Sequence, residues 1–317
     1  MKNVDLIFDI LDQAALIYYE NLRLDYFSSL TEINKNLNQN EYNNRLLEKI
    51  IEKLEFIYKP LLEGSYANEE IRLALELYIV KGLKHINYPQ NLMTPDFINY
   101  IFVIIINELY QGSDIIVMDT NLGTGNLLAA IKNNYGGNAS LIGIENDLKL
   151  TNFASAFMEI QQSEIKIYFQ DALNKAHDLV DVVIGDLANH FVSDNLKLDL
   201  QLYKDNIRYF PYLTIASRID NLVDGGYFIY LVDNEFFSLD HMSTFKKYLD
   251  GKVSLSGLIV LPKKIVLEEH SGKSIIIGKK TNKAHDLMAI EISDVDNNSL
   301  QNSISKIKTM IEKLKEE

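Results

Sequence analysis

The 317-residue sequence contains no cysteine. Disulfides and thiolate metal sites are therefore excluded, and we expect a protein of the reducing cytoplasm without a metal centre. Long apolar runs are also missing and an acid, Asp5, stands close to the start, so neither a secretion signal nor a membrane span is predicted. Basic residues are in deficit, with 31 Lys and Arg against 44 Asp and Glu. The net charge of -13 opposes tight nonspecific binding to a polyanion.

The first ninety residues differ in pattern from the remainder. Up to about residue 90, apolar residues recur at helical spacing with charges between them, as in residues 5–11 and 45–54. This pattern predicts a helical domain over residues 1–90, most simply a set of core-forming helices, with a surface for a protein partner as the alternative. Residues 85–91 include a proline and several polar residues. We predict a linker there and a second domain over residues 91–317.

Short β-rich runs alternate with helical patterns after residue 90. This alternation predicts an α/β fold with a parallel, doubly wound sheet. The last two runs are separated by a polar segment too short for a crossover helix, so we expect them to pair antiparallel, and we expect an amphipathic helix over residues 302–317. The predicted parallel strands are residues 115–118, 141–144, 165–169, 180–184 and 227–232, and the predicted antiparallel pair is residues 255–261 with 274–278.

One glycine-spaced segment, residues 119–128, joins the first predicted strand to a helical pattern. It reads Asp-Thr-Asn-Leu-Gly-Thr-Gly-Asn-Leu-Leu. Gly123 and Gly125 let the backbone approach a ligand closely, and the helix start offers free N–H groups. Asp119 would repel a pyrophosphate but would hold an amino-acid ammonium group, as in S-adenosylmethionine (SAM). Leu128 stands where a dinucleotide-binding loop has its third small residue, which disfavours a nicotinamide cofactor.

Two further acids follow the next predicted strands. Glu145 comes at the tip of the second strand, where a carboxylate can accept both hydroxyls of a ribose, with helix capping as the alternative. Asp171, in Gln-Asp-Ala after the third strand, can bond the amino group of an adenine while Ala172 leaves room for the ring; capping is again the alternative. Upstream, Thr94 as N-cap, Pro95 at the first helical position and Asp96 beside it predict a helix start that needs no ligand.

In this order the motifs resemble class I SAM-dependent methyltransferases of the amino-group type, specifically the small adenine-specific DNA methyltransferase-like proteins of Gram-positive bacteria. These proteins join a helical N-terminal domain to a Rossmann-like catalytic domain. Their loop usually reads Asp-Pro-x-x-Gly-Thr-Gly-Asn-Leu-Leu, and here Thr120 replaces the proline. The resemblance implies a role in SAM binding for seven residues. Thr94 and Asp119 would hold the methionine end, Gly123 and Gly125 would pass beneath it, Glu145 would bind the ribose, and Asp171 and Ala172 would face the adenine.

The segment after the fourth predicted strand carries the catalytic residues of that family. Amino methyltransferases place Asn, Asp or Ser there, then prolines and an aromatic residue, because an acceptor side chain and a backbone carbonyl must draw on the N–H bonds of a delocalised amino group. The aromatic ring stacks on the flipped base. Here Asp186 remains as the acceptor and Phe191 as the stacking ring, but Ala188 replaces the proline that helps to aim the carbonyl. His190 is an addition to the pattern, and a lone loop histidine is more often solvated than catalytic.

We therefore expect a SAM-dependent N-methyltransferase, acting by resemblance on adenine in DNA. One alternative is a catalytically weakened SAM-binding protein that serves as an interaction module. The other is an NAD-dependent oxidoreductase, which Asp119 disfavours. After Phe237 only about eighty residues remain, too few for a target-recognition domain in addition to the predicted strands and helix. The acceptor is then a nucleic acid presented by a partner protein, or another amine.

Overall fold

The computed structural model describes residues 2–86, 88, 92–263, 272–292 and 297–316. The chain forms two compact units that each take segments from several parts of the sequence. The first unit contains Met1–Asn99, Leu122–Asn134 and Glu145–Phe169, and the second contains Tyr100–Asn121, Tyr135–Ile144 and Gln170–Glu317. The linker predicted over residues 85–91 lies partly outside the described residues. Division of the chain into two domains at residue 90 stays a prediction.

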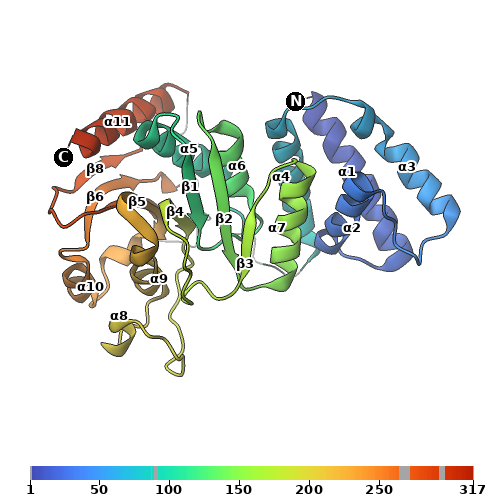
Figure 1. The fold of residues 1–317 in the computed structure, drawn as a ribbon. Coiled ribbons are helices and arrows are strands. Elements are labelled where there is room, and N and C mark those ends of the chain that lie inside the picture. The colour runs from blue at the N-terminus through green and yellow to red at the C-terminus, as the bar shows by residue number, and fades with distance from the viewer. Residues whose placement is uncertain (1, 87, 89–91, 264–271, 293–296, 317) are drawn as a thin grey trace. The chain divides into compact units, whose positions relative to one another are not determined.

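The first unit is mainly helical. Amphipathic patterning accounts for this, since α1 buries Ile7, Ile10, Leu11 and Ala14 at helical spacing. Helix α2 packs on α7 through the rings of Phe27 and Phe153, whose centres are 4.3 Å apart. The elements of this unit are α1 (Lys2–Leu22), α2 (Tyr26–Gln39), α3 (Glu48–Glu63), α4 (Asn68–His85), α6 (Asn126–Asn134), α7 (Leu148–Ile160) and β3 (Lys166–Phe169) (Figure 1). We call α1–α4 the helical domain.

The second unit is built on a mixed sheet. Among the described residues, its strands follow the order β2-β1-β4-β5-β7-β6-β8. The pairs β2–β1, β1–β4 and β4–β5 are parallel, whereas β7 runs antiparallel to both β5 and β6. The bounds are β1 (Ile115–Asp119), β2 (Ala139–Glu145), β4 (Val180–Asp186), β5 (Leu222–Asp233), β6 (Val253–Val260), β7 (Lys273–Lys280) and β8 (Met288–Glu291). Both the parallel sheet and the antiparallel final pair are confirmed, and β8, which pairs parallel with β6, was not predicted.

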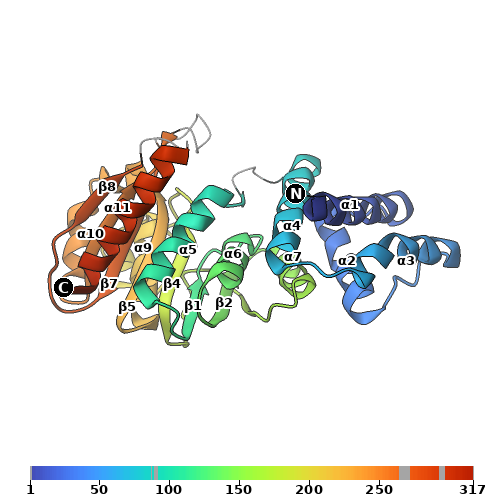
Figure 2. The same cartoon turned by 90° about the horizontal axis from the view of Figure 1, so that it is seen from above.

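Helices cover both faces of this sheet. Helices α5 (Asp96–Tyr110) and α11 (Asn297–Glu316) lie on one face, and α9 (Phe210–Arg218) and α10 (Met242–Leu249) lie on the other (Figures 1 and 2). An ion pair of 2.7 Å between Lys308 and Glu108 joins α11 to α5. The short helix α8 (Gln201–Lys204) precedes α9. In the described part of the chain, no helix is both long enough and apolar enough to cross a membrane.

The register of the sheet brings several charged residues to one edge. Asp119 pairs with Ile184, Asp186 with Leu231, and Asp233 with Lys273. The carboxyl ends of β1, β4 and β5 therefore meet the amino end of the antiparallel β7 at the same edge. In doubly wound sheets, ligands bind at the carboxyl ends of the parallel strands.

Candidate functional site

The predicted cofactor loop adopts a conformation that depends on its glycines. Gly123 and Gly125 have φ angles of 54° and 83°, in the left-handed region that residues with a Cβ atom seldom adopt. Gly125 donates its N–H to the carbonyl of Leu122 at 2.9 Å, and its own carbonyl accepts from Ala129 at 3.0 Å. The loop therefore turns tightly into α6, which begins at Asn126.

Glu145 is bonded directly to this loop. Its Oε2 accepts from the Gly123 N–H at 2.9 Å, and its Oε1 accepts from the N–H groups of Asn146 and Asp147 at 2.9 and 2.8 Å. Burial raises the pKa of Glu145, although these three hydrogen bonds act in the opposite direction. A carboxylate can accept about four hydrogen bonds, so an acceptor position on Oε2 remains for a ribose hydroxyl. The capping alternative is not what the structure shows, because Asp147 caps α7.

The Thr94–Asp96 segment starts a helix one residue later than predicted. The first carbonyl to accept helical hydrogen bonds belongs to Pro95, from Ile98 at 2.8 Å and Asn99 at 3.1 Å, and α5 begins at Asp96. Both Thr94 and Pro95 suit a helix start, so the local sequence does not distinguish the two positions. Thr94 is buried, and Asp96 accepts a hydrogen bond from Arg72 at 2.7 Å.

In the second unit, Asp119 is a buried carboxylate at the end of β1. Only 1% of the residue is exposed, and its Oδ1 accepts from the Asn121 N–H at 2.9 Å. Thr120, at the position of the family's proline, bonds the carbonyl of Ile184 through its N–H at 3.0 Å and its hydroxyl at 3.2 Å. A Cβ at Gly185 would come within 2.8 Å of that hydroxyl oxygen. A carboxylate buried in this way suits a ligand that brings an ammonium group.

The segment with Asp171 and Ala172 forms a turn held by a buried arginine. Asp171 Oδ1 accepts from the Leu173 N–H at 2.8 Å, which is a side-chain turn and not a helix cap. Arg218, at the end of α9, donates to the carbonyls of Ala172 and Asn174. Burial lowers the pKa of Arg218. Arg218 was not among the predicted site residues, since nothing near it in the chain indicates a contact 46 positions away.

Asp186 forms an ion pair at the end of β4. Its Oδ1 accepts from Lys273 Nζ at 2.7 Å, and the side chains are only 17% and 15% exposed. Lys273 was not predicted either, because it lies 87 positions away and comes to Asp186 through the antiparallel placement of β7. The acceptor carboxylate in the predicted catalytic segment is therefore neutralised by a lysine.

Aromatic contacts hold the loop after β4. Phe191 is 62% exposed, with its ring centre 5.4 Å from that of Tyr209, and the two residues form an isolated antiparallel bridge. His190 stacks on Phe210 at 4.4 Å. Partial burial lowers the pKa of His190, so the neutral imidazole is favoured. Phe191 thus presents an aromatic surface to solvent, while His190 contributes to the packing of the loop.

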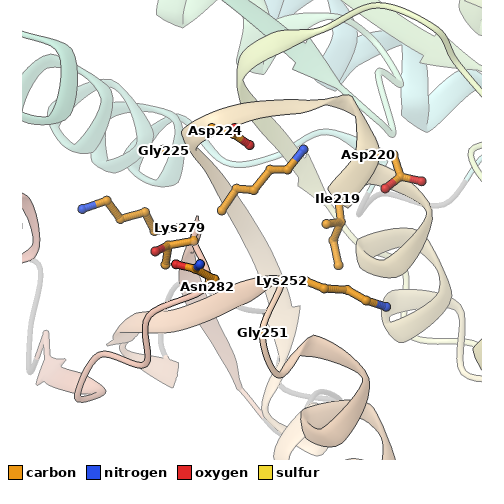
Figure 3. Close-up of a pocket in the computed structure, with 10 residues that line it drawn as sticks. Ile219, Asp220, Asp224, Gly225, Gly251, Lys252, Lys279 and Asn282 are labelled. Atoms are coloured by element: carbon orange, nitrogen blue, oxygen red, sulfur yellow. The ribbon is translucent and has the colours of Figure 1, made fainter.

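A separate hollow of about 610 Å³ lies in the second unit (Figure 3). It lies where β5 begins and β7 ends, which is the sheet edge away from Asp186. Lys280 donates to the carbonyl of Leu222 at 2.6 Å, and Lys252 Nζ lies 3.7 Å from the centre of the Tyr248 ring. The residues around the hollow are Ile219, Asp220, Asp224, Gly225, Gly251, Lys252, Lys279, Lys280, Thr281 and Asn282, and they include none of the predicted site residues.

Comparisons with known proteins agree with this architecture. The family model for the YtxK N-terminal helical domain matches residues 5–83. Uncharacterized protein YtxK of Bacillus subtilis (strain 168) is 28% identical over 277 residues, which cover 83% of this chain and 82% of that protein. A crystal structure of a candidate class I SAM-dependent methyltransferase from Listeria monocytogenes matches with a TM-score of 0.84 and 25% identity, covering 98% of this chain and 99% of that one.

A further match lies among restriction-modification proteins. The type I restriction-modification system methyltransferase subunit from Streptococcus thermophilus gives a TM-score of 0.61 at 15% identity, over 97% of this chain and 73% of that one. That level of identity is evidence for the fold alone. The chain therefore has the fold of the class I SAM-dependent methyltransferases and resembles the proteins that carry a YtxK-type helical domain at the N-terminus.

Proposed function

We propose that this protein is a SAM-dependent methyltransferase that methylates an exocyclic amino nitrogen, as on adenine in a nucleic acid. The observation that carries the proposal is the hydrogen bond from the Gly123 N–H to Glu145 Oε2. It joins the glycine loop to the acid at the tip of the next strand, and these two features contact the cofactor in Rossmann-like folds. The class I fold supports the same assignment.

The proposed cofactor contacts follow from the chemistry of the side chains. Asp119 provides a buried negative charge for the ammonium group of SAM, and Thr94 acts at the same methionine end. Glu145 accepts from a ribose hydroxyl, and Asp171 accepts from the adenine amino group beside Ala172. Bound SAM supplies a methyl group on a positively charged sulfur. An acid at Asp119 does not suit the pyrophosphate of a nicotinamide cofactor, and the oxidoreductase alternative has no support.

In the proposed reaction, the residues after β4 prepare the amino group for attack. Asp186 accepts a hydrogen bond from one N–H of the amino group and so increases the electron density on the nitrogen. After transfer, the nitrogen loses a proton, which the same carboxylate can receive. Lys273 holds Asp186 in place and offsets its charge. The exposed ring of Phe191 stacks on a flat base, which is a typical mode of binding for an unpaired nucleotide. Because the net charge is -13, we propose that a partner protein presents the nucleic acid.

The proposal is tested first by calorimetric titration of the purified protein with SAM and, separately, with NADH. We expect micromolar SAM binding that Asp119→Ala abolishes. Transfer of labelled methyl from SAM is then measured on single-stranded and duplex oligonucleotides containing adenine and on a lysine peptide. Asp186→Ala should lower transfer at least about a hundredfold while leaving SAM affinity within about twofold. The matched control is Asp240→Ala, an exposed acid of the same unit, which should change neither.

Three results would count against the proposal. Absence of SAM binding would overturn it entirely. Unchanged transfer in Asp186→Ala would remove the assigned acceptor. SAM binding without transfer to any tested acceptor would favour the alternative of a catalytically weakened SAM-binding protein.

A further inference from the structure

The buried Arg72 connects the helical domain to two segments that carry predicted site residues. It lies on α4, and its side chain is fully buried. Its Nη1 donates to Asn126 Oδ1 at 2.9 Å, and its Nη2 donates to Asp96 Oδ1 at 2.7 Å. Asn126 directly follows Gly125 and is the first residue of α6, and Asp96 directly follows Thr94 and Pro95. One guanidinium therefore contacts both the residue that follows the glycine turn and the residue two positions after Thr94.

The geometry of this cluster requires an arginine. The guanidinium has five N–H donors in a planar fork, and described residues accept five hydrogen bonds from it. Besides Asn126 and Asp96, Glu69 accepts from Nε at 2.9 Å and from Nη2 at 2.7 Å, and Glu76 accepts from Nη1 at 3.1 Å. A lysine would retain the charge but could not reach all of these acceptors. The cluster is thus specific for the shape of arginine as well as for its charge.

Helix α6 is held to α4 at both of its ends. Arg72 contacts Asn126 at the first residue of α6, and Asn133, near the last, donates through Nδ2 to Glu69 Oε2 at 3.2 Å. Asn126 is 1% exposed, so water cannot readily replace the arginine as its partner. The start of α6 is consequently fixed relative to the helical domain.

We propose that Arg72 is a positioning residue for SAM, which fixes Asn126 and thereby the conformation of the Gly123–Gly125 turn. The inference rests on the proposed function and adds a role for the helical domain, which is to order the cofactor loop. Glycines with positive φ have more accessible conformations than other residues, so an untethered loop loses more entropy when it binds a ligand. Holding the residue after Gly125 reduces that loss before SAM arrives.

The test measures SAM affinity and thermal stability on the full chain in parallel. We expect Arg72→Lys and Asn126→Ala each to raise the Kd for SAM by at least about tenfold, because either change frees the loop. The double variant should bind little worse than Arg72→Lys alone if both act through one contact. The matched control is Leu75→Ala, which removes a fully buried side chain from the same helix outside the cluster. It should lower the melting temperature and leave the Kd unchanged.

The outcomes separate this inference from the proposed function. If the wild-type protein does not bind SAM, both are overturned. If the wild type binds SAM and both single variants bind within about twofold of it, only the positioning role is overturned. A Kd that rises as much in Leu75→Ala as in Arg72→Lys would also refute it, since general loss of stability would then explain the effect. Should Arg72→Lys fail to fold, Asn126→Ala against Leu75→Ala decides the question.

Discussion

Glu76 is a carboxylate whose ionisation should destabilise the protein. Among the described residues, it shares Arg72 with Glu69 and Asp96, so three carboxylates face one guanidinium. Burial and repulsion by Asp96 raise the pKa of Glu76 from 4.5 to about 7, although Arg72 and Asn126 act in the opposite direction. The folded protein therefore holds the Glu76 proton more tightly than the unfolded chain does. The stabilisation that this bound proton gives the folded state is fully present below pH 4.5 and is lost as the pH rises through about 7.

The size of the effect follows from the pKa change. One pH unit corresponds to about 1.4 kcal/mol, so moving the pKa from 4.5 to about 7 corresponds to about 3 kcal/mol. Glu76→Gln cannot ionise and keeps nearly the same volume. We expect the variant to unfold with a free energy about 1–3 kcal/mol higher than that of the wild type at pH 8, and with a much smaller difference at pH 5.

Urea titrations followed by circular dichroism at pH 5, 6, 7 and 8 measure this difference. The matched control is Glu63→Gln, an exposed carboxylate at the end of α3 whose side chain is 68% exposed. We expect that control to follow the wild type at every pH. A difference between Glu76→Gln and the wild type that does not change with pH would refute the reasoning, because the variant would then act through packing and not through a proton.

Three further predictions concern other parts of the chain. Asp147→Ala removes the N-cap of α7 and should lower the free energy of unfolding by about 1 kcal/mol in chemical denaturation, whereas Asp147→Asn should retain most of it. Gly125→Ala places a Cβ in the left-handed region and should lower the free energy of unfolding by about 1–2 kcal/mol. It should also weaken SAM binding measured by calorimetry. If neither the free energy of unfolding nor the SAM affinity changes, the loop relaxes to accommodate the Cβ. Lys273→Met removes the cation that pairs with the partly buried Asp186 carboxylate and should lower the free energy of unfolding by about 1–3 kcal/mol, whereas adding Asp186→Asn should recover part of that loss. Additive losses in that double-mutant cycle would argue against a coupled pair.

Local patterns were sufficient to predict most of the secondary structure. The β-rich runs at residues 115–118 and 180–184 correspond to β1 and β4, and the predicted C-terminal helix is α11. These predictions succeed because alternation of apolar residues and glycine-marked turns are properties of neighbouring residues. Strand β8 was missed because Ile290 is the one β-branched or aromatic residue among its four, so this run carries little of the strand signal.

Two features that the sequence assigned to the candidate site are joined in the structure. Gly123 and Gly125 indicated a close turn, and both have positive φ in the structure. Glu145 was assigned to the same site from its place after the loop, and its carboxylate bonds the Gly123 N–H. The roles of these residues in SAM binding stay predictions. The residues themselves determine only which chemical group lies at the end of each strand.

The tertiary structure alone decided which long-range contacts Lys273, Arg72 and Arg218 make. Strand β7 lies between β5 and β6, and this placement brings Lys273 to Asp186 across 87 positions of sequence. Arg72 bonds Asn126, which is 54 positions away, and Arg218 holds the Asp171 segment from α9. Such contacts depend on the order of strands and the packing of helices, and no local pattern of residues encodes either. The sequence thus specified the turns, the helices and strands, and the positions of the carboxylates in the chain. Long-range packing determined which cations contact the residues of the candidate site.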